Sequence, residues 1–313
     1  MTKRAFTFPG QGSQAVGMGK DLAGTYQEAR NVFAEVDDAL GQKLSTLMFE
    51  GPEETLRLTE NAQPALMAVS VAVTRVLESR GFALKEQAAY VAGHSLGEYS
   101  ALAAAGAFSL ADAARLLRTR GEAMQKAVPV GQGAMAAILG LDLETVERVC
   151  AEAAAGDVCG LANDNAPGQV VISGNLAAVN RAIELLKAAG AKRALPLPVS
   201  APFHCALMQP AAEAMRAALD KVAVRAPVVP VVANVLAAPI SDPAEIKMRL
   251  VEQVTGRVRW TECVGWLVRD GGVTQLVELG AGKVLSGLAK RIAPETAAVS
   301  VSTSADVGAF LAG

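Results

Sequence analysis

The sequence predicts an α/β protein in which a large domain, built on a parallel sheet, is interrupted by a smaller α+β domain. Two observations carry this prediction. Short apolar runs alternate with helical periodicity before residue 130 and after residue 199, which is typical of a parallel sheet covered by helices on both faces. Residues 131–198 follow a different order, β-α-β-β-α-β, which is typical of a ferredoxin-like unit.

The composition is that of a compact globular protein. The 313 residues are 51% apolar and 19% charged, and 29 Lys and Arg stand against 31 Asp and Glu. This balance indicates no nucleic-acid partner, and no apolar run reaches the roughly 18 residues that a membrane span needs. The cysteines lack C-x-x-C spacing and nearby histidines, so we expect reduced thiols in a cytoplasmic protein, with no metal site. They are Cys150, Cys159, Cys205 and Cys263.

The N-terminal strand is expected at residues 5–8, and it leads into the loop Pro-Gly-Gln-Gly-Ser-Gln at residues 9–14. The glycines superficially resemble a dinucleotide-binding fingerprint. Pro9 argues against one, as does the lack of a second strand that ends in an acidic residue about 20 residues later. The loop is therefore either a plain tight turn or a source of backbone N–H groups for an oxyanion hole. Residues 20–60 look helical and peripheral.

Two long helices are expected beside the sheet. Residues 59–78 form an apolar helix with Gln63 near its start, where this side chain could point into a site. Residues 110–127 form a second helix that carries three arginines. Periodicity alone favours a solvated face for any one of them, Arg120 included.

The motif Gly-His-Ser-Leu-Gly at residues 93–97 lies between an apolar run at 88–92 and a helix expected over 99–105. A nucleophile elbow needs this context, because its serine sits on a sharp strand-to-helix turn flanked by small residues. Ser95 would then present its hydroxyl above the sheet, and the N–H of Leu96 would face any oxyanion formed there. A glycine-rich turn required only for packing is the alternative.

The small domain is expected at residues 131–198, between the two parts of the large domain at 1–130 and 199–313. The turn between its middle strands, at 163–168, is rich in amides that could reach a thioester carbonyl or a pantetheine amide. An ordinary hairpin loop has the same composition, so both interpretations stay open. The expected strands cover 134–139, 158–162, 169–173 and 192–197, and the expected helices cover 143–155 and 177–189.

A proline-rich segment at residues 196–205 returns the chain to the large domain, with His204 near its end. The later elements again alternate between strand and helix, with the stretch at 261–269 left unassigned. The expected strands are 228–234, 274–279 and 297–301, and the expected helices are 207–222, 243–254 and 283–292.

The chain has two histidines, which narrows the choice of a base for Ser95. His94 is adjacent to the serine, and neighbouring residues on an elbow point apart. His204 remains by elimination, although a lone histidine is often structural. Because 109 residues follow His204 without another histidine, the Ser-Asp-His order of hydrolases does not fit. A Ser-His dyad oriented by a carbonyl or an amide fits better, and the orienting group stays open.

Together, these segments resemble the malonyl-CoA:acyl carrier protein transacylases of bacterial fatty-acid synthesis. The resemblance covers nearly the whole chain and implies a hydrolase-like large domain with a ferredoxin-like insertion. The matching segments, in order, are Phe-Pro-Gly-Gln-Gly-Ser-Gln at 8–14, Gln-Pro-Ala at 63–65, Gly-His-Ser-Leu-Gly-Glu at 93–98, Arg-Gly at 120–121, Ala-Asn at 162–163, Pro-Gly-Gln-Val-Val at 167–171, His-Cys at 204–205, Gln253 seven residues before Trp260, and Gly-x-Gly-Lys-Val-Leu at 280–285.

The resemblance implies a role for each matching site residue. Ser95 matches the nucleophile and His204 its base. Arg120 matches the arginine that pairs with the malonyl carboxylate, which replaces the solvated-face interpretation. Gln11 and Leu96 match the backbone donors of the oxyanion hole, and Gln253 matches the residue whose main chain orients the histidine.

The remaining substrate-binding positions follow from the same resemblance together with the interpretations above. Gln63, Asn163 and Asn165 complete the expected set. In the related acyltransferase domains of polyketide synthases, residues like Phe203 and Leu96 accompany malonyl over methylmalonyl. Phe203 departs from many free-standing members, which have a small residue there.

The implied partners are malonyl-CoA and a phosphopantetheinylated acyl carrier protein, with the coenzyme A thioester as substrate and no cofactor. An esterase or thioesterase that uses water as acceptor is the second hypothesis, and a non-catalytic scaffold that binds carrier protein is the third. Because the carrier is acidic, a basic docking surface is expected; its candidates are Lys187, Lys192, Arg193, Lys283, Lys290 and Arg291.

Overall fold

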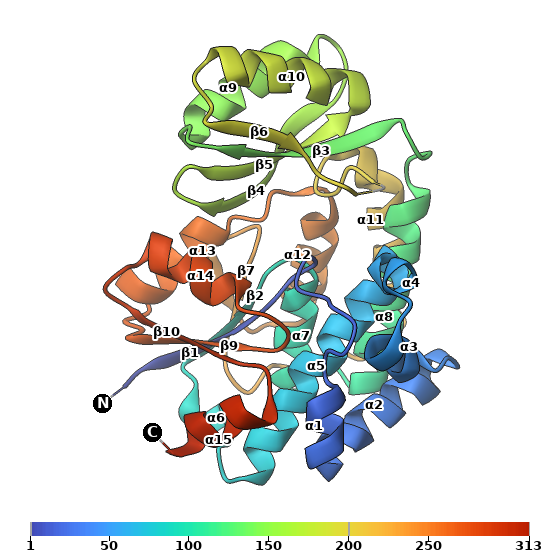
Figure 1. Ribbon diagram of the computed structural model, residues 1–313, viewed down its shortest axis with the longest axis vertical. Helices are drawn as coiled ribbons and strands as arrows, with labels where there is room; N and C mark the ends of the chain where they lie inside the picture. Colours follow the sequence, from blue (N-terminus) through green and yellow to red (C-terminus); the bar gives the residue numbers. More distant parts are fainter. Residues whose placement is uncertain (1, 200, 313) are drawn as a thin grey trace.

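A computed structural model describes residues 2–199 and 201–312, so Met1, Ser200 and Gly313 of the expected domain ranges lie outside the described residues. The chain forms a mixed α/β structure with two separate sheets (Figure 1). The six-stranded sheet is built from both ends of the chain, and the four-stranded sheet from its middle. No helix in the described part of the chain is long and apolar enough to cross a bilayer.

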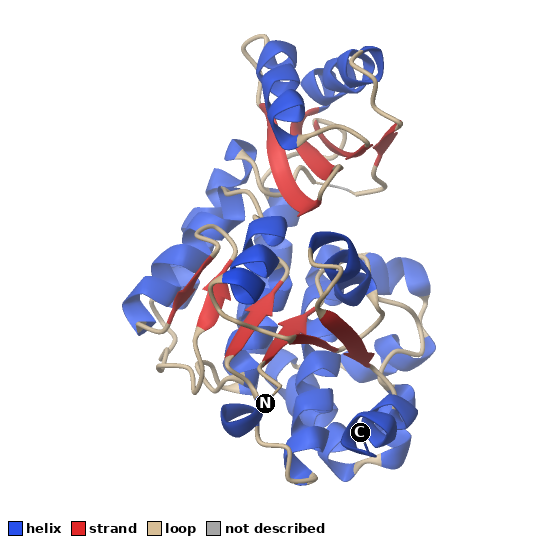
Figure 2. Cartoon of the chain, turned by 90° about the vertical axis from the view of Figure 1, so that its left-hand side faces the viewer, coloured by secondary structure: helices blue, strands red, loops and turns tan. Residues whose placement is uncertain are grey.

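The larger sheet has the strand order β10-β9-β1-β2-β7-β8, and Figure 2 shows its strands side by side between helices. Its first five strands are parallel, as expected. The last, β8, runs antiparallel to β7 and was not predicted. The strands are β1 (Arg4–Phe8), β2 (Tyr90–Gly93), β7 (Val231–Ala233), β8 (Ala238–Ile240), β9 (Gln275–Leu279) and β10 (Ala297–Val301).

Alternate residues of β1 enter two different hydrophobic cores. Phe6 and Phe8 pack into the core beneath the long helices, whereas Ala5 packs into the core on the other face. The prediction that helices cover both faces is therefore confirmed. One face is covered chiefly by α2 (Gln27–Leu40), α5 (Thr59–Ser79), α7 (Leu96–Ala104), α8 (Leu110–Lys126), α11 (Gln209–Leu219) and α12 (Pro243–Thr255), and the other by α13 (Trp260–Arg269) and α14 (Val284–Ile292).

The smaller sheet has the strand order β4-β5-β3-β6, and its pairs are antiparallel. Its elements follow one another in the predicted order, and two helices cover its outer face above a core of its own. The strands are β3 (Gly133–Leu139), β4 (Cys159–Ala166), β5 (Gln169–Asn175) and β6 (Arg193–Pro196), and the helices are α9 (Leu143–Ala154) and α10 (Leu176–Ala188).

The amide-rich segment after residue 162 is strand and not the expected turn. β4 continues to Ala166 through two irregularities in its pairing with β5. The strand can continue because the large domain supplies a partner: Asn163 bridges Val258, and the N–H of Asp164 donates to the carbonyl of Val258 at 2.9 Å. This backbone contact fastens the small sheet to the large domain.

Other departures lie at the ends of elements. The helix after the elbow begins at Leu96, not at residue 99, and the helical region at 20–60 is divided into four helices. Two of its breaks fall at Gly41 and Gly51, whose positive φ angles end the preceding helices. The remaining helices are α1 (Lys20–Thr25), α3 (Leu44–Glu50), α4 (Glu53–Arg57), α6 (Leu84–Gln87), the 3₁₀ turn η1 (Ala206–Met208) and the unpredicted α15 (Ser304–Ala312).

Candidate active site

Ser95 occupies a strained corner between β2 and α7. Its φ of 54° and ψ of −110° lie in a region that non-glycine residues rarely adopt. The flanking glycines make this corner possible, because a Cβ on Gly93 would lie 1.8 Å from the carbonyl oxygen of Gly97. A Cβ on Gly97 would lie 2.2 Å from the carbonyl oxygen of Phe8. The spacing of glycine around the serine is therefore a steric requirement of the turn.

His204 approaches Ser95 from the segment that follows the small domain. Its Nε2 lies 2.8 Å from the Ser95 Oγ. Its Nδ1 faces the carbonyl oxygens of Gln253, at 2.9 Å, and Gly256, at 3.1 Å. Since a carbonyl can only accept, Nδ1 carries the proton and Nε2 presents its lone pair to the serine hydroxyl. Two main-chain carbonyls fill the orienting role that sequence reasoning left open.

The imidazole is kept neutral. Burial, and after it the positive charge of Arg120, lower the pKa of His204 to about 3. A histidine that stays unprotonated at neutral pH can accept a proton from the serine as soon as a substrate requires it.

Arg120 is buried beside the same serine, so the solvated-face interpretation from periodicity is wrong for this residue. Its side chain is 1% exposed. Its Nη2 donates to the Ser95 Oγ at 3.1 Å and to Gln253 Oε1 at 2.8 Å, and its Nη1 donates to Gln63 Oε1 at 2.8 Å. The guanidinium also lies 5.7 Å from the centre of the Tyr99 ring. Gln63 and Gln253 thus hold a positive charge against the Ser95 hydroxyl.

The other two arginines of α8 make different contacts. Arg115 pairs with Asp112 on the surface, and Arg118 donates to side-chain oxygens of Gln42 and Asn61. Helical spacing places Arg120 on a different side of α8 from Arg115 and Arg118. The same helix therefore carries one arginine that contacts Ser95 and two that have other partners.

Two backbone N–H groups near Ser95 are available to an oxyanion. Neither the Leu96 N–H nor the Gln11 N–H donates to an acceptor among the described residues. Leu96 is the first residue of α7, where the helix dipole adds to the attraction for negative charge. The Gln11 side chain is engaged elsewhere, with Nε2 3.2 Å from Thr59 Oγ1.

Asn165 meets the elbow, but Asn163 does not. The Asn165 Oδ1 lies 2.8 Å from Nε2 of His94. Asn163 is buried, 7% exposed, at the bridge to Val258 and makes no side-chain hydrogen bond to Ser95, His204 or Arg120.

Sequence reasoning missed two buried polar residues behind the serine. Asn234, directly after β7, accepts the Ser95 N–H on Oδ1 at 2.8 Å and donates from Nδ2 to the Gly93 carbonyl at 2.7 Å. Glu98 of α7 accepts from the Asn234 N–H at 3.1 Å and from Gln253 Nε2 at 2.8 Å. A polar residue at the carboxyl end of an apolar strand, beside a topological switch point, is the signal that could have identified Asn234.

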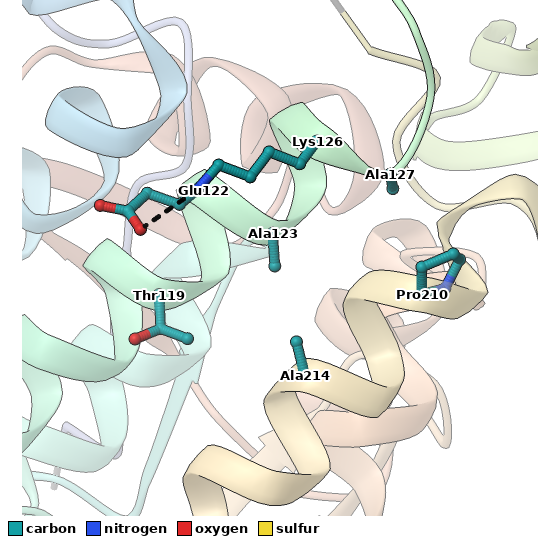
Figure 3. Close-up of a pocket in the computed structure, with 7 residues that line it drawn as sticks. All are labelled: Thr119, Glu122, Ala123, Lys126, Ala127, Pro210 and Ala214. Atoms are coloured by element: carbon teal, nitrogen blue, oxygen red, sulfur yellow. Dashed lines mark ion pairs between the residues drawn. The ribbon is translucent and has the colours of Figure 1, made fainter.

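A surface hollow of about 320 Å³ lies between α8 and α11, apart from this site (Figure 3). It is lined by surface-facing residues of α8 and by the start of α11, and it contains neither member of the dyad. Within the described ranges, no group of three or more His, Cys, Asp or Glu side chains is placed to hold a metal ion. The lining residues are Thr119, Glu122, Ala123, Lys126, Ala127, Pro210 and Ala214.

Comparison with known proteins identifies the family. The acyl transferase domain family matches residues 5–279. The malonyl CoA-acyl carrier protein transacylase of Bacillus subtilis is 49% identical over 303 residues, which cover 96% of this chain and 94% of that protein. The crystal structure of an acyl-carrier-protein-S-malonyltransferase from Bartonella henselae superposes with a TM-score of 0.97 at 57% identity, covering 99% of this chain and 98% of the other.

A malonyl-transacylase solved in complex with a type II PKS acyl-carrier protein is also similar, with a TM-score of 0.96, 47% identity and coverage of 99% of both chains. These similarities cover nearly the whole chain. The chain therefore belongs to the acyltransferase family, among its malonyl-CoA:acyl carrier protein transacylases.

Proposed function

We propose that this enzyme transfers the malonyl group of malonyl-CoA to the phosphopantetheine thiol of an acyl carrier protein, for fatty-acid synthesis. The transfer passes through a malonyl ester of Ser95. The observation that carries the proposal is the position of Arg120, a buried cation 3.1 Å from the nucleophilic oxygen. An acyltransferase for neutral acyl groups has no use for a desolvated guanidinium at that point.

The first half-reaction begins with the dyad. His204 Nε2 takes the Ser95 hydroxyl proton while Oγ attacks the thioester carbonyl. The oxyanion of the tetrahedral intermediate accepts hydrogen bonds from the N–H groups of Leu96 and Gln11. When the C–S bond breaks, the leaving coenzyme A thiolate receives the proton from His204.

The second half-reaction reverses these steps with another thiol. The phosphopantetheine thiol gives its proton to His204, and the thiolate attacks the ester carbonyl. The C–O bond to Ser95 then breaks, and Oγ recovers the proton. The two carbonyls behind Nδ1 hold the ring in one orientation through both transfers.

Arg120 supplies the selectivity for a charged acyl group. Burying an unpaired carboxylate is costly, whereas a guanidinium can bind both carboxylate oxygens and fix their position. Gln63 and Gln253 accept from this guanidinium, which keeps it extended toward Ser95. The Gln63, Asn163 and Asn165 amides are proposed to contact the acyl and pantetheine parts, and Phe203 to limit the size of the acyl group.

Substitution of Arg120 tests the proposal. We expect Arg120→Ala to lower kcat/KM for malonyl-CoA by about a hundredfold or more, equivalent to a lost charge-assisted bidentate pair, while activity with acetyl-CoA is retained. Arg118→Ala, which removes an arginine bonded to Gln42 and Asn61 on the same helix, is the matched control. Equal losses with both substrates would contradict the role of Arg120.

Intact-mass measurement separates the alternative functions. Incubation with malonyl-CoA should add about 86 Da at Ser95, an adduct that a binding scaffold would not acquire. The isolated acyl-enzyme should then transfer its malonyl group to a carrier thiol faster than it hydrolyses, whereas an esterase would release it to water.

We also propose the finer features of the fold and of the enzyme's setting. An elbow between a parallel strand and a helix supports a hydrolase-like large domain at 1–130 and 199–313, and the separate core of the small sheet supports a ferredoxin-like domain at 131–198. We place the enzyme in the cytoplasm, without a cofactor. The basic docking surface remains a prediction, although two of its candidates have partners: Arg291 donates to Pro167 and Gln169, and Lys187 pairs with Glu184.

A further inference from the structure

Glu98 is a buried carboxylate that takes no part in the proposed acyl transfer. Glu98 lies one helical turn after Ser95 and is 1% exposed. Its Oε2 accepts from the Asn234 N–H and from Gln253 Nε2. A fully buried carboxylate is expensive to keep unless a positive charge compensates it, and no Lys or Arg forms an ion pair with it in the described residues.

The compensating charge lies one amide away. Gln253 donates from Nε2 to Glu98 and accepts on Oε1 from Arg120, so its amide group bridges a buried anion and a buried cation. The same Nε2 donates to the Ser95 carbonyl at 3.0 Å, which leaves only one orientation of the amide. By accepting from Gln253 Nε2, Glu98 fixes the orientation of the Gln253 amide, whose Oε1 holds Arg120 toward Ser95.

The other titratable groups around Glu98 are neutral. Tyr99 lies on the same helix, and Cys263 faces Glu98 from α13; burial raises the pKa of both, so the phenol and the thiol stay protonated. Asn234 of the β7 end and Gln253 of α12 do not titrate. Arg120, from α8, is the positive charge that acts on Glu98.

We propose that Glu98 is the internal counter-charge of Arg120, and that binding of the malonyl carboxylate is coupled to the uptake of a proton by Glu98. This inference rests on the proposed function, because it needs a carboxylate that binds Arg120. With the substrate in place, two carboxylates share one guanidinium, and both Glu98 and Arg120 are buried. Protonation of Glu98 restores the charge balance while its Oε2 still accepts from Asn234 and Gln253.

The environment of Glu98 favours this exchange. Burial raises the pKa of its carboxyl to about 7, against the lowering effect of the hydrogen bonds from Gln253 and Asn234 and of the Arg120 charge. The carboxyl therefore changes protonation near neutral pH, where a second negative charge nearby is enough to drive proton uptake. Acetyl-CoA carries no acyl carboxylate, so its binding should cause no proton uptake by Glu98.

Calorimetry on a variant that binds without reacting tests the proposal. Ser95→Ala is titrated with malonyl-CoA and with acetyl-CoA at pH 8 in two buffers of different ionisation enthalpy. We expect malonyl-CoA binding to take up about half a proton or more per site beyond acetyl-CoA, and its Kd to weaken by up to about tenfold per pH unit above pH 7. Zero excess uptake would overturn the proposal.

Variants that each remove one carboxylate identify the group that takes up the proton. Glu98→Gln in the Ser95→Ala background keeps an acceptor oxygen, and we expect it to abolish the excess uptake and to flatten the pH dependence of the Kd. Glu213→Gln, on the exposed surface of α11, should change neither. Excess uptake that persists in Glu98→Gln would place the proton elsewhere and overturn the proposal.

A spectroscopic measurement does not depend on the stability of Glu98→Gln. The infrared difference spectrum of Ser95→Ala with malonyl-CoA minus acetyl-CoA should contain the carbonyl band of a protonated carboxyl group, and the lack of this band would overturn the proposal. The test is distinct from that of the proposed function: if wild-type Ser95 acquires no malonyl adduct the function fails, whereas an adduct without proton uptake removes only the role of Glu98.

Discussion

At the scale of single residues, Asn234 supports the strained elbow from behind. Its side chain accepts the Ser95 N–H and donates to the Gly93 carbonyl, so it holds the peptide groups on both sides of the turn. Asn234→Ala leaves these groups buried and unpaired, and we expect a loss of about 2–4 kcal/mol in the free energy of unfolding. The displaced serine should also lower kcat by about tenfold to a hundredfold, a barrier increase of about 1–3 kcal/mol.

Chemical denaturation and steady-state kinetics measure the two effects. Asn180→Ala on the exposed face of α10 is the control, and we expect it to stay within about 0.5 kcal/mol of wild type. If Asn234→Ala kept its full kcat while losing stability, Asn234 would support the fold and not the position of the nucleophile.

Site residues could be predicted from sequence where chemistry alone restricts the choice. Ser95 stands out through its flanking glycines, and His204 through the scarcity of histidine. Arg120 could not be derived from periodicity, because the same helix carries arginines with other partners and burial depends on which neighbours pack against each face. Asn234 bonds the serine, and Glu98 bonds Asn234 and Gln253, so these roles depend on hydrogen bonds between segments far apart in the sequence.

At the scale of elements, the contact between the start of α7 and β1 sets the position of the elbow. A Cβ added to Gly97 would lie 2.2 Å from the Phe8 carbonyl oxygen and 2.9 Å from that of Pro9, both backbone atoms that cannot yield cheaply. We expect Gly97→Ala to push the helix from the strand and to cost about 3 kcal/mol or more of stability, with loss of malonylation of Ser95.

Gly287 provides a matched control in another helix, α14. It is exposed, and a Cβ there meets nothing within 4 Å. Gly287→Ala should leave activity unchanged and raise stability by about 0.5–1 kcal/mol, because alanine favours helix. A Gly97→Ala enzyme as stable and active as wild type would show that the backbone can relax without cost.

Long helices with a strong periodicity of apolar residues could be predicted. Strand ends that depend on pairing with a segment far away in the sequence could not. The apolar helix α5 was expected within one residue of its observed end at Ser79. The end of β4 was misjudged because its Asn-Asp-Asn composition suggests a turn. The pairing of Asn163 and Asp164 with Val258, nearly a hundred residues later, overrides this local preference.

At the scale of the whole molecule, the order of strands and helices could be predicted from the sequence, because the pattern of elements changes where the chain enters and leaves the small sheet. The way the two sheets are joined could not. The joining contacts involve both side chains and backbone: Asn165 with His94, Val258 with β4, and Arg291 with Pro167. Together they hold the dyad, contributed by two parts of the large domain, beneath the small sheet.

Because folding buries His204, the free energy of unfolding depends on pH. The unfolded chain exposes His204 with an ordinary pKa near 6.5, whereas burial and the Arg120 charge lower the pKa in the folded protein to about 3. Above pH 6.5 both states hold a neutral ring, and the histidine adds no pH dependence. As the pH falls below 6.5 only the unfolded state takes up the proton, so folding stability decreases until the pH reaches the folded pKa.

The histidine's contribution can be isolated by comparing wild type with His204→Gln, which cannot ionise but retains every other titrating group. Between pH 7.5 and 5.0 we expect the wild-type free energy of unfolding to fall by about 2 kcal/mol more than that of the variant. Urea denaturation at the two pH values measures this difference. Parallel losses in the two proteins would mean that folded His204 accepts a proton near pH 6.5, against the effects of burial and of the Arg120 charge.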